Sequence, residues 1–242
     1  MKPTRDQIVD LSHRLLRRRD NYEYEAKLDP TSRTGPRDER FDPFDAPFDE
    51  KAWYIEGVAY IAGKAGTHVK VPYTCDMRGT DTMRYPTERL IGECYTIDCS
   101  GKHPGEEIKL ADVKKAEGKI EPGDIVFIYT GMGENYRTPR WRDWIPFEPA
   151  ALEWLLDQGI KAIGTDGPSI EYLGGLGAFP STVRTEATGE PAQHACFERG
   201  VAIVESLANL DRIVGERVTV FILALPMEEM PASPVRVVAL RA

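Results

Sequence analysis

The stretch EPGDIVFIYTG, residues 121–131, places a continuous apolar run directly after a Pro-Gly-Asp turn. A short run rich in β-branched and aromatic residues predicts a buried strand. EPAALEWLLDQG (148–159) follows, with three leucines at helical spacing and a terminal glycine, and predicts a helix that ends at that glycine. KAIGTD (161–166) is apolar again. A strand, a helix and a second strand in this order indicate an α/β domain.

Other short runs along the chain have the composition of buried strands. They are WYIEGVAYIA (53–62), CYTIDC (94–99), GVAIVES (200–206), RVTVFILAL (217–225) and VRVVAL (235–240). The last of these are less regularly separated by helices than the earlier ones. We predict a single α/β domain over residues 51–242.

The first fifty residues have a different character. Residues 4–19 carry three aliphatic side chains at helical spacing behind a threonine that can cap a helix, which predicts an N-terminal helix. The segment that follows is rich in Pro, Asp and Arg and has no periodicity. We expect residues 1–50 to form this helix and an extended arm. Phe41, Phe44 and Phe48 would pin the arm to a neighbouring surface, which another subunit could supply.

The composition excludes several classes of protein. The chain has 242 residues, 41% of them hydrophobic, and a net charge of −8, so it lacks the basic footprint of a nucleic-acid-binding protein. No run of about 18 apolar residues predicts a membrane span. The N-terminus has no apolar signal core, and the four cysteines have no metal or disulfide spacing, so we expect a cytoplasmic protein with free thiols. A small-molecule substrate is the partner that remains.

The stretch KAGTHVKVPYTCD, residues 64–76, carries the candidate chemistry. In a regular strand His68, Lys70 and Thr74 share one face, and Lys64 leads into it. Protonated lysines offer no lone pair, so the pattern indicates an electropositive pocket and not a conventional metal cage. A solvated or salt-bridged strand edge is the alternative.

Two further segments hold candidate residues. Asp166 and Ser169 come just after a predicted strand, where α/β sheets bind ligands, although the same residues can also satisfy their own turn. Arg140 and Trp141 could form a lid that binds a carboxylate and a ring, or simply pack on the surface. Cys75 is a nucleophile only if a neighbouring lysine lowers its pKa.

Several segments together resemble one known family. GTHVKVPYT (66–74) is similar to the HxGTHxDxPxH signature of the cyclase family, which includes kynurenine formamidase and isatin hydrolase. IVDLSHRL (8–15) resembles that family's N-terminal DLSHPL segment, which conflicts with the helix predicted there. The other matches are IEPGDIVFIYTG (120–131), GIKAIGTDGPSIE (159–171), RGVAIVESLANLDRI (199–213) and SPVRVVAL (233–240).

This resemblance implies a fold, an assembly and a reaction. The fold would be the swivelling β/β/α type, an α/β class with a mixed sheet. The assembly would be a homo-oligomer, commonly a dimer or tetramer. The reaction would be hydrolysis of a formamide or cyclic amide at a divalent metal.

The positions of the family's metal ligands hold other residues here. The first signature's ligands fall on Lys64, His68 and Lys70, and its last histidine falls on Thr74. The later pair falls on Gln193 and Glu205, and His194 could substitute for Gln193 if the local turn shifts. Only His68 and Glu205 match cleanly, so tight metal binding is not expected.

We therefore predict a metal-independent enzyme of the cyclase family that opens or closes an amide, lactam or related carbonyl-containing ring. Lys64 and Lys70 would stabilise a developing oxyanion, and His68 or Glu205 would move protons. No cofactor is expected, although a weak divalent metal at His68 and Glu205 stays open. The substrate-binding candidates are Tyr73, Thr74, Arg140, Trp141, Asp166, Ser169, Gln193 and His194.

Two alternatives keep the fold and change the function. A lysine beside another cation can act as a neutral amine, which would allow a lyase, isomerase or decarboxylase. The chain could also be a non-catalytic ligand-binding descendant.

Overall fold

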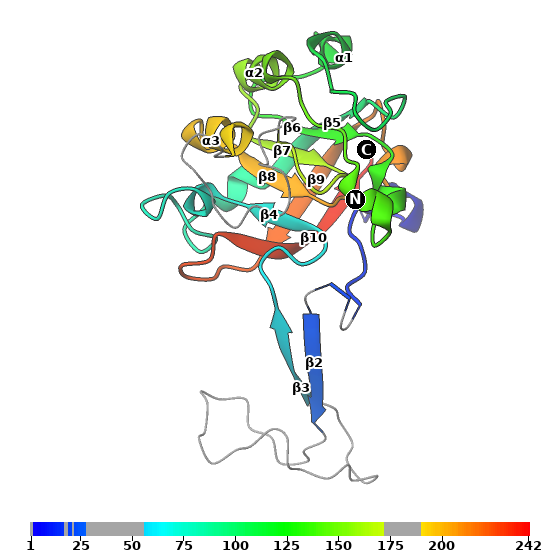
Figure 1. Ribbon diagram of the computed structural model, residues 1–242. Helices are drawn as coiled ribbons and strands as arrows, with labels where there is room; N and C mark the ends of the chain where they lie inside the picture. Colours follow the sequence, from blue (N-terminus) through cyan, green and yellow to red (C-terminus); the bar gives the residue numbers. More distant parts are fainter. Residues whose placement is uncertain (1, 17–18, 21, 28–55, 172–189) are drawn as a thin grey trace.

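The computed structural model describes residues 2–16, 19–20, 22–27, 56–171 and 190–242. Its centre is an eight-stranded mixed sheet, covered on one side by three helices (Figure 1). The helices are α1 (Leu110–Val113), α2 (Pro149–Asp157) and α3 (Pro191–Glu198). The strands are β1 (Ile8–Asp10), β4 (His68–Lys70), β5 (Ile91–Asp98), β6 (Ile125–Tyr129), β7 (Ala162–Thr165), β8 (Ala202–Glu205), β9 (Arg217–Ala224) and β10 (Ala232–Leu240).

The sheet closes on itself. Its strand order is β1-β10-β4-β8-β7-β6-β5-β9, and β9 pairs again with β10, so seven strands form a barrel to which β1 is added. β5, β6, β7 and β8 run parallel, and the remaining pairings are antiparallel. The predicted α/β class with a mixed sheet is confirmed.

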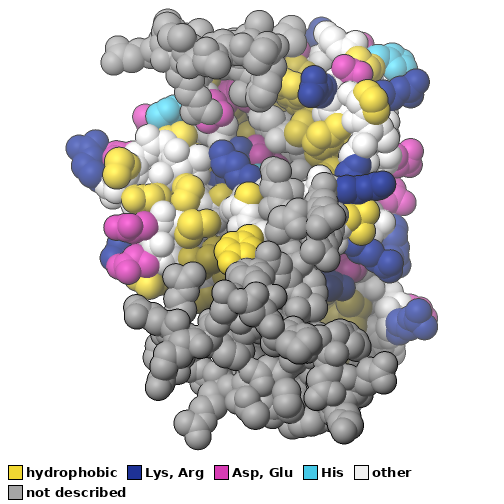
Figure 2. Space-filling view, turned by 60° about the horizontal axis from the view of Figure 1, so that its bottom comes forward, with side chains coloured by type: hydrophobic (Ala, Val, Ile, Leu, Met, Phe, Trp, Pro, Cys, Tyr) yellow, Lys and Arg dark blue, Asp and Glu magenta, His cyan; other side chains and the backbone are white. Residues whose placement is uncertain are grey.

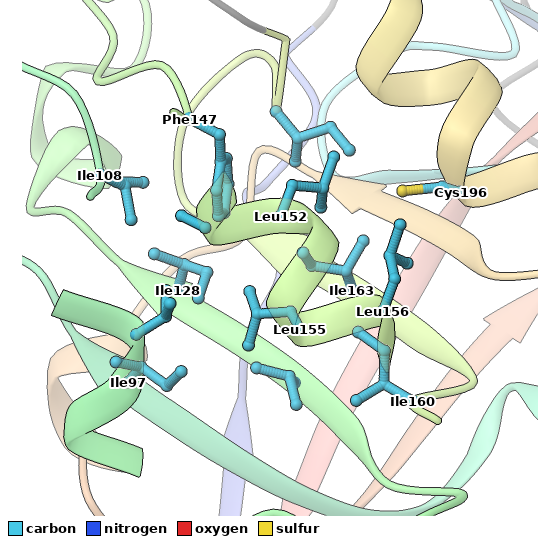
Figure 3. Packing of buried hydrophobic residues seen from close by; sticks show 14 of the residues in the cluster. Ile97, Ile108, Ile128, Phe147, Leu152, Leu155, Leu156, Ile160, Ile163 and Cys196 are labelled. Atoms are coloured by element: carbon cyan, nitrogen blue, oxygen red, sulfur yellow. The ribbon is translucent and has the colours of Figure 1, made fainter. Parts of the chain in front are cut away.

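Two hydrophobic cores lie on the two faces of the barrel wall. Along β6, Val126 and Ile128 belong to the core under the helices, and Ile125 and Phe127 belong to the core inside the barrel. This alternation is the period of a strand that is buried on both faces. Figure 3 shows the outer core, where α2 lays its leucines on the sheet.

Helix α2 forms where the sequence predicts it. Pro149 occupies its first turn, where a missing backbone N–H costs nothing. Leu152, Leu155 and Leu156 are buried on one face. Gly159 has a φ of 75°, the left-handed conformation that commonly ends a helix.

The helix predicted over residues 4–19 is wrong. Arg5–Gln7 form one 3₁₀ turn, and the chain then enters β1, which pairs antiparallel with β10. Val9 and Leu11 are fully buried, whereas Ile8 is 42% exposed, so burial alternates with the period of a strand. These residues have helical spacing, but their pairing with β10 makes them a strand.

A second, two-stranded sheet projects from the barrel (Figure 1). β2 (Tyr22–Lys27) pairs antiparallel with β3 (Glu56–Ile61). The predicted arm with Phe41, Phe44 and Phe48, and the expected domain limit at residue 50, lie outside the described residues. No helix in the described part of the chain is long and apolar enough to cross a membrane.

Substitution of Gly164 on β7 tests how tightly the barrel interior is packed. A methyl group there would lie 2.6 Å from Phe127 Cδ1 and 2.8 Å from Leu207 Cδ1. We expect Gly164→Ala to lower the free energy of unfolding by about 1–3 kcal/mol, measured by urea denaturation. Gly101→Ala is the matched control, because a methyl group at Gly101 meets nothing within 4 Å. Equal losses in the two variants would contradict the close packing around Gly164.

Candidate active site

Neighbouring strands β4 and β8 bring three ionisable side chains together. His68 and Lys70 lie on β4, and Glu205 ends β8. The register sets His68 opposite Glu205 and Lys70 opposite Ile203, whose side chain belongs to the core under the helices. The three ionisable side chains therefore face α3. They are only 5%, 4% and 2% exposed, respectively.

The Glu205 carboxylate contacts both of the other groups. Lys70 Nζ lies 2.6 Å from Oε1, and His68 Nε2 lies 3.2 Å from Oε2. The Lys70–Glu205 contact joins a cation to an anion, both almost completely buried. Lys70 Nζ also donates to Gln193 Oε1 at 2.9 Å, and this glutamine is buried on α3. Lys70 thus joins β4, β8 and α3.

The hydrogen bonds of His68 decide where its protons lie. Nδ1 is 2.9 Å from the Gly66 carbonyl oxygen, which can only accept, so Nδ1 carries a proton. Nε2 faces the Glu205 carboxylate, which also only accepts when it is ionised. The contact is attractive when one more proton lies between Nε2 and the carboxylate.

Two opposing effects act on Glu205. Burial raises the pKa of its carboxyl group, while the Lys70 and His68 charges lower it. The net direction is downward from the usual value of 4.5, so the carboxylate is the form that the site favours. The Lys70 ammonium is the largest cause that lowers this pKa.

A divalent metal fits this set of side chains poorly. The Lys70 ammonium sits between Glu205 and Gln193 and offers no lone pair. His68 and Glu205 supply two donors, fewer than structural or catalytic zinc sites use. Within the described ranges, no group of three or more His, Cys, Asp or Glu side chains could hold a metal ion.

Two predicted site residues, Lys64 and His194, have exposed side chains. Lys64 is exposed in the turn before β4, and its charge, like that of Lys70, acts on the Cys75 thiol. Burial and the Glu190 charge nevertheless raise the pKa of that thiol, so Cys75 is not activated as a nucleophile. His194 is exposed on α3, one residue after Gln193, so Gln193 is the side chain that faces Lys70.

The turn after β4 redirects the next two candidates. Pro72–Thr74 form a 3₁₀ turn, which ends the alternation of the strand. Tyr73 packs against the barrel core, on the opposite face from Lys70. Thr74 Oγ1 donates to the Pro231 carbonyl at 2.8 Å.

Asp166 and Ser169 are used within their own loops. Asp166 Oδ1 accepts from Thr130 N and Oγ1 at 2.9 and 2.6 Å, and Oδ2 accepts from Gly133 N at 3.3 Å. Ser169 Oγ accepts from the Glu171 backbone N–H at 3.0 Å. These contacts match the alternative in which the segment satisfies its own backbone.

The sequence interpretation missed Glu171. Its side chain is fully buried, and Oε1 accepts from the Ala192 N–H at 3.0 Å, in the first turn of α3. The carboxylate therefore anchors the helix that carries Gln193. The signal was present, because Glu171 ends the GIKAIGTDGPSIE segment quoted above.

The aromatic segment supports the turn that precedes His68. Trp141 is edge-on to Tyr136, with ring centroids 5.1 Å apart, and the His13 ring stacks on Tyr136 at 4.0 Å. The His13 backbone N–H donates to Thr67 Oγ1 at 2.9 Å. Burial and the Arg137 charge lower the pKa of His13 to about 4, so its imidazole is neutral at pH 7. Arg140 is exposed, outside this stack.

Removing the ammonium at position 70 should make stability depend on pH. In the wild type the pKa of Glu205 is lowered, so the carboxylate stabilises the fold above the unfolded pKa of about 4.5 and loses this effect as pH falls. Lys70→Met leaves a buried carboxylate without its main partner. We expect a loss of about 3–5 kcal/mol near pH 8, measured by urea denaturation.

The loss in Lys70→Met should shrink near pH 5, because burial then raises the pKa of Glu205 and the neutral acid costs less to bury. Lys70→Met combined with Glu205→Gln should recover part of the stability at both pH values. The same loss at both pH values, without recovery in the double variant, would contradict the ion pair.

Comparison with known proteins agrees with the matched segments. The family model "Cyclase: Putative cyclase" matches residues 9–172. A kynurenine formamidase from Erythrobacter litoralis is 30% identical over 187 residues, which cover 74% of this chain and 76% of that protein. A kynurenine formamidase from Salinibacter ruber is 27% identical and covers 75% and 78%.

Solved structures agree in fold. An isatin hydrolase bound to the product analogue thioisatinate superimposes with a TM-score of 0.75. The match covers 97% of this chain and 92% of that one, at 18% sequence identity. At this identity the likeness establishes the shared fold.

Proposed function

The chain belongs to the cyclase family, and from that premise we propose that it is a metal-independent enzyme that opens or closes an amide, lactam or related ring. The names of its relatives suggest an aryl formamide or a cyclic amide such as isatin as the substrate class. A cytoplasmic homo-oligomer is part of the same proposal.

One observation carries this proposal. Lys70 Nζ lies between Glu205 Oε1 and Gln193 Oε1, at 2.6 and 2.9 Å. The resemblance assigns both of those positions, and position 70 itself, to metal ligands. The buried Lys70 ammonium therefore lies where, by this resemblance, relatives hold a metal cation. Fixed positive charge in a water-poor site can polarise a carbonyl and stabilise the oxyanion that forms from it.

Proton transfer follows from the His68–Glu205 contact. When water attacks the carbonyl carbon, the ionised Glu205 can accept one of its protons. As the C–N bond breaks, the proton on His68 Nε2 can pass to the leaving nitrogen. The 3.2 Å contact then allows the proton on Glu205 to return to His68. One proton is taken from water and one is given to nitrogen, so the pair is restored.

The ion pair argues against a covalent role for Lys70. A Schiff base requires a neutral amine with room to attack a carbonyl. Lys70 Nζ instead contacts a carboxylate at 2.6 Å and an amide oxygen at 2.9 Å. Borohydride trapping with an active substrate should therefore yield no adduct at Lys70, and an adduct found there by mass spectrometry would favour the lyase alternative.

Hydrolysis of isatin and of formylkynurenine tests the proposal directly. We expect turnover of at least one of these classes that persists after treatment with EDTA. Lys70→Met should lose about a hundredfold or more in kcat, the usual cost of removing an oxyanion-stabilising donor. Lys64→Met, at an exposed position, should lose far less. Activity that disappears with EDTA and returns with a divalent metal would overturn metal independence.

Changing Lys70 and Gln193 to residue types that the family uses as metal ligands tests whether Lys70 occupies a metal-ligand position. The readout is metal binding, not activity. Lys70→Asp with Gln193→His places two donors beside His68 and Glu205. We expect this double variant to bind Zn²⁺ with a one-to-one stoichiometry by calorimetry, because four nitrogen and oxygen ligands suit zinc. Gln193→His alone keeps the ammonium and should not bind. Tight zinc binding by the wild type would contradict the proposal.

A further inference from the structure

A cavity of about 430 Å³ opens beyond the ends of β5 and β6, apart from the Lys70 cluster. Its walls come from the loop after β5, with Lys102 and Pro104, and from the long segment after β6, residues 130–145. This volume lies within the range of about 300–1,000 Å³ that holds small ligands. The carboxyl ends of neighbouring parallel strands are also where α/β proteins place their ligands. Neither Lys70 nor any of its contacts lines the cavity.

The cavity lining holds two cationic side chains and one anionic side chain. Arg140 and Asp143 both line it: Arg140 lies within the 3₁₀ turn Pro139–Arg142, and Asp143 follows directly after that turn. Their side chains form no ion pair with each other or with any other residue that the structure describes. Lys102, the other cation in the lining, is already held by Asp112 at 2.6 Å. A guanidinium and a carboxylate thus remain available to a ligand.

The rest of the lining is apolar with a few polar groups. Met132 and Ile145 line the cavity and are almost completely buried, so they form its apolar part. The Asn135 amide is a further donor, since its only side-chain contact within the described ranges is a weak one to the Met132 sulfur at 3.9 Å. Apolar side chains beside a guanidinium and a carboxylate match a molecule with an apolar side chain and both charges.

We propose that this cavity is a second binding site, for a zwitterionic α-amino acid with an apolar side chain. Arg140 binds the carboxylate through paired N–H groups, as guanidinium groups commonly do. Asp143 binds the ammonium group. Met132 and Ile145 contact the side chain.

Calorimetric titration of the full chain with L-tryptophan tests the site. We expect saturable one-to-one binding. Arg140→Met and Asp143→Asn should each weaken it about tenfold or more, the usual loss for a hydrogen bond to a charged group. Arg142→Met is the matched control, because Arg142 is exposed on the same turn and does not line the cavity. It should leave the affinity unchanged.

Ligand analogues separate the two charges. N-acetyl-L-tryptophan lacks the cation and L-tryptophan amide lacks the anion, so each should bind about tenfold more weakly or worse. The absence of binding, equal binding of the N-acetyl compound, or affinity unaffected by both cavity variants would overturn the proposal. Lys70→Arg changes only the catalytic cluster and should bind normally. Loss of binding there, with Arg140→Met unaffected, would place the ligand in the catalytic cluster instead.

Discussion

A carboxylate buried inside a protein must have a counter-charge, and Glu205 imposes this requirement on the whole site. It ends β8 with 2% exposure and faces the helices. The β4–β8 register supplies the counter-charge, because it places His68 directly opposite Glu205 and Lys70 two residues further along β4. Gln193 then satisfies the ammonium from α3. The barrel wall and the helix layer are thus joined through one charged group, and the chemistry that we propose uses the same contacts.

Much of the fold follows from the sequence because buried strands and one amphipathic helix have strong local patterns. Strand β6 and helix α2 form where their sequence patterns predict a strand and a helix. The prediction of an N-terminal helix was wrong. The aliphatic residues there are spaced as in a helix, but Val9 and Leu11 are buried with the two-residue period of a strand. That alternation is imposed by β10, more than 200 residues away, and local periodicity cannot report such a pairing.

The candidate site was predictable in part, for similar reasons. Strand alternation predicts that His68 and Lys70 share a face, and the family resemblance adds Glu205, which β8 places opposite His68. The same alternation fails at Tyr73, because a 3₁₀ turn intervenes and turns the side chain toward the barrel core. Glu171 was missed because it acts through a backbone N–H of α3, a contact that has no signature in side-chain type.

Closure of the barrel also affects how the chain can meet other chains. A strand at a sheet edge offers unpaired backbone groups to which a second molecule can add a strand, a route to aggregation. β9 and β10 are paired on both sides, so β1, three residues long, is the strand that remains at an edge of the eight-stranded sheet. The described barrel therefore offers little backbone for strand addition. Any association through it must rely on side-chain surfaces, where charges of both signs are interspersed on the face that Figure 2 shows.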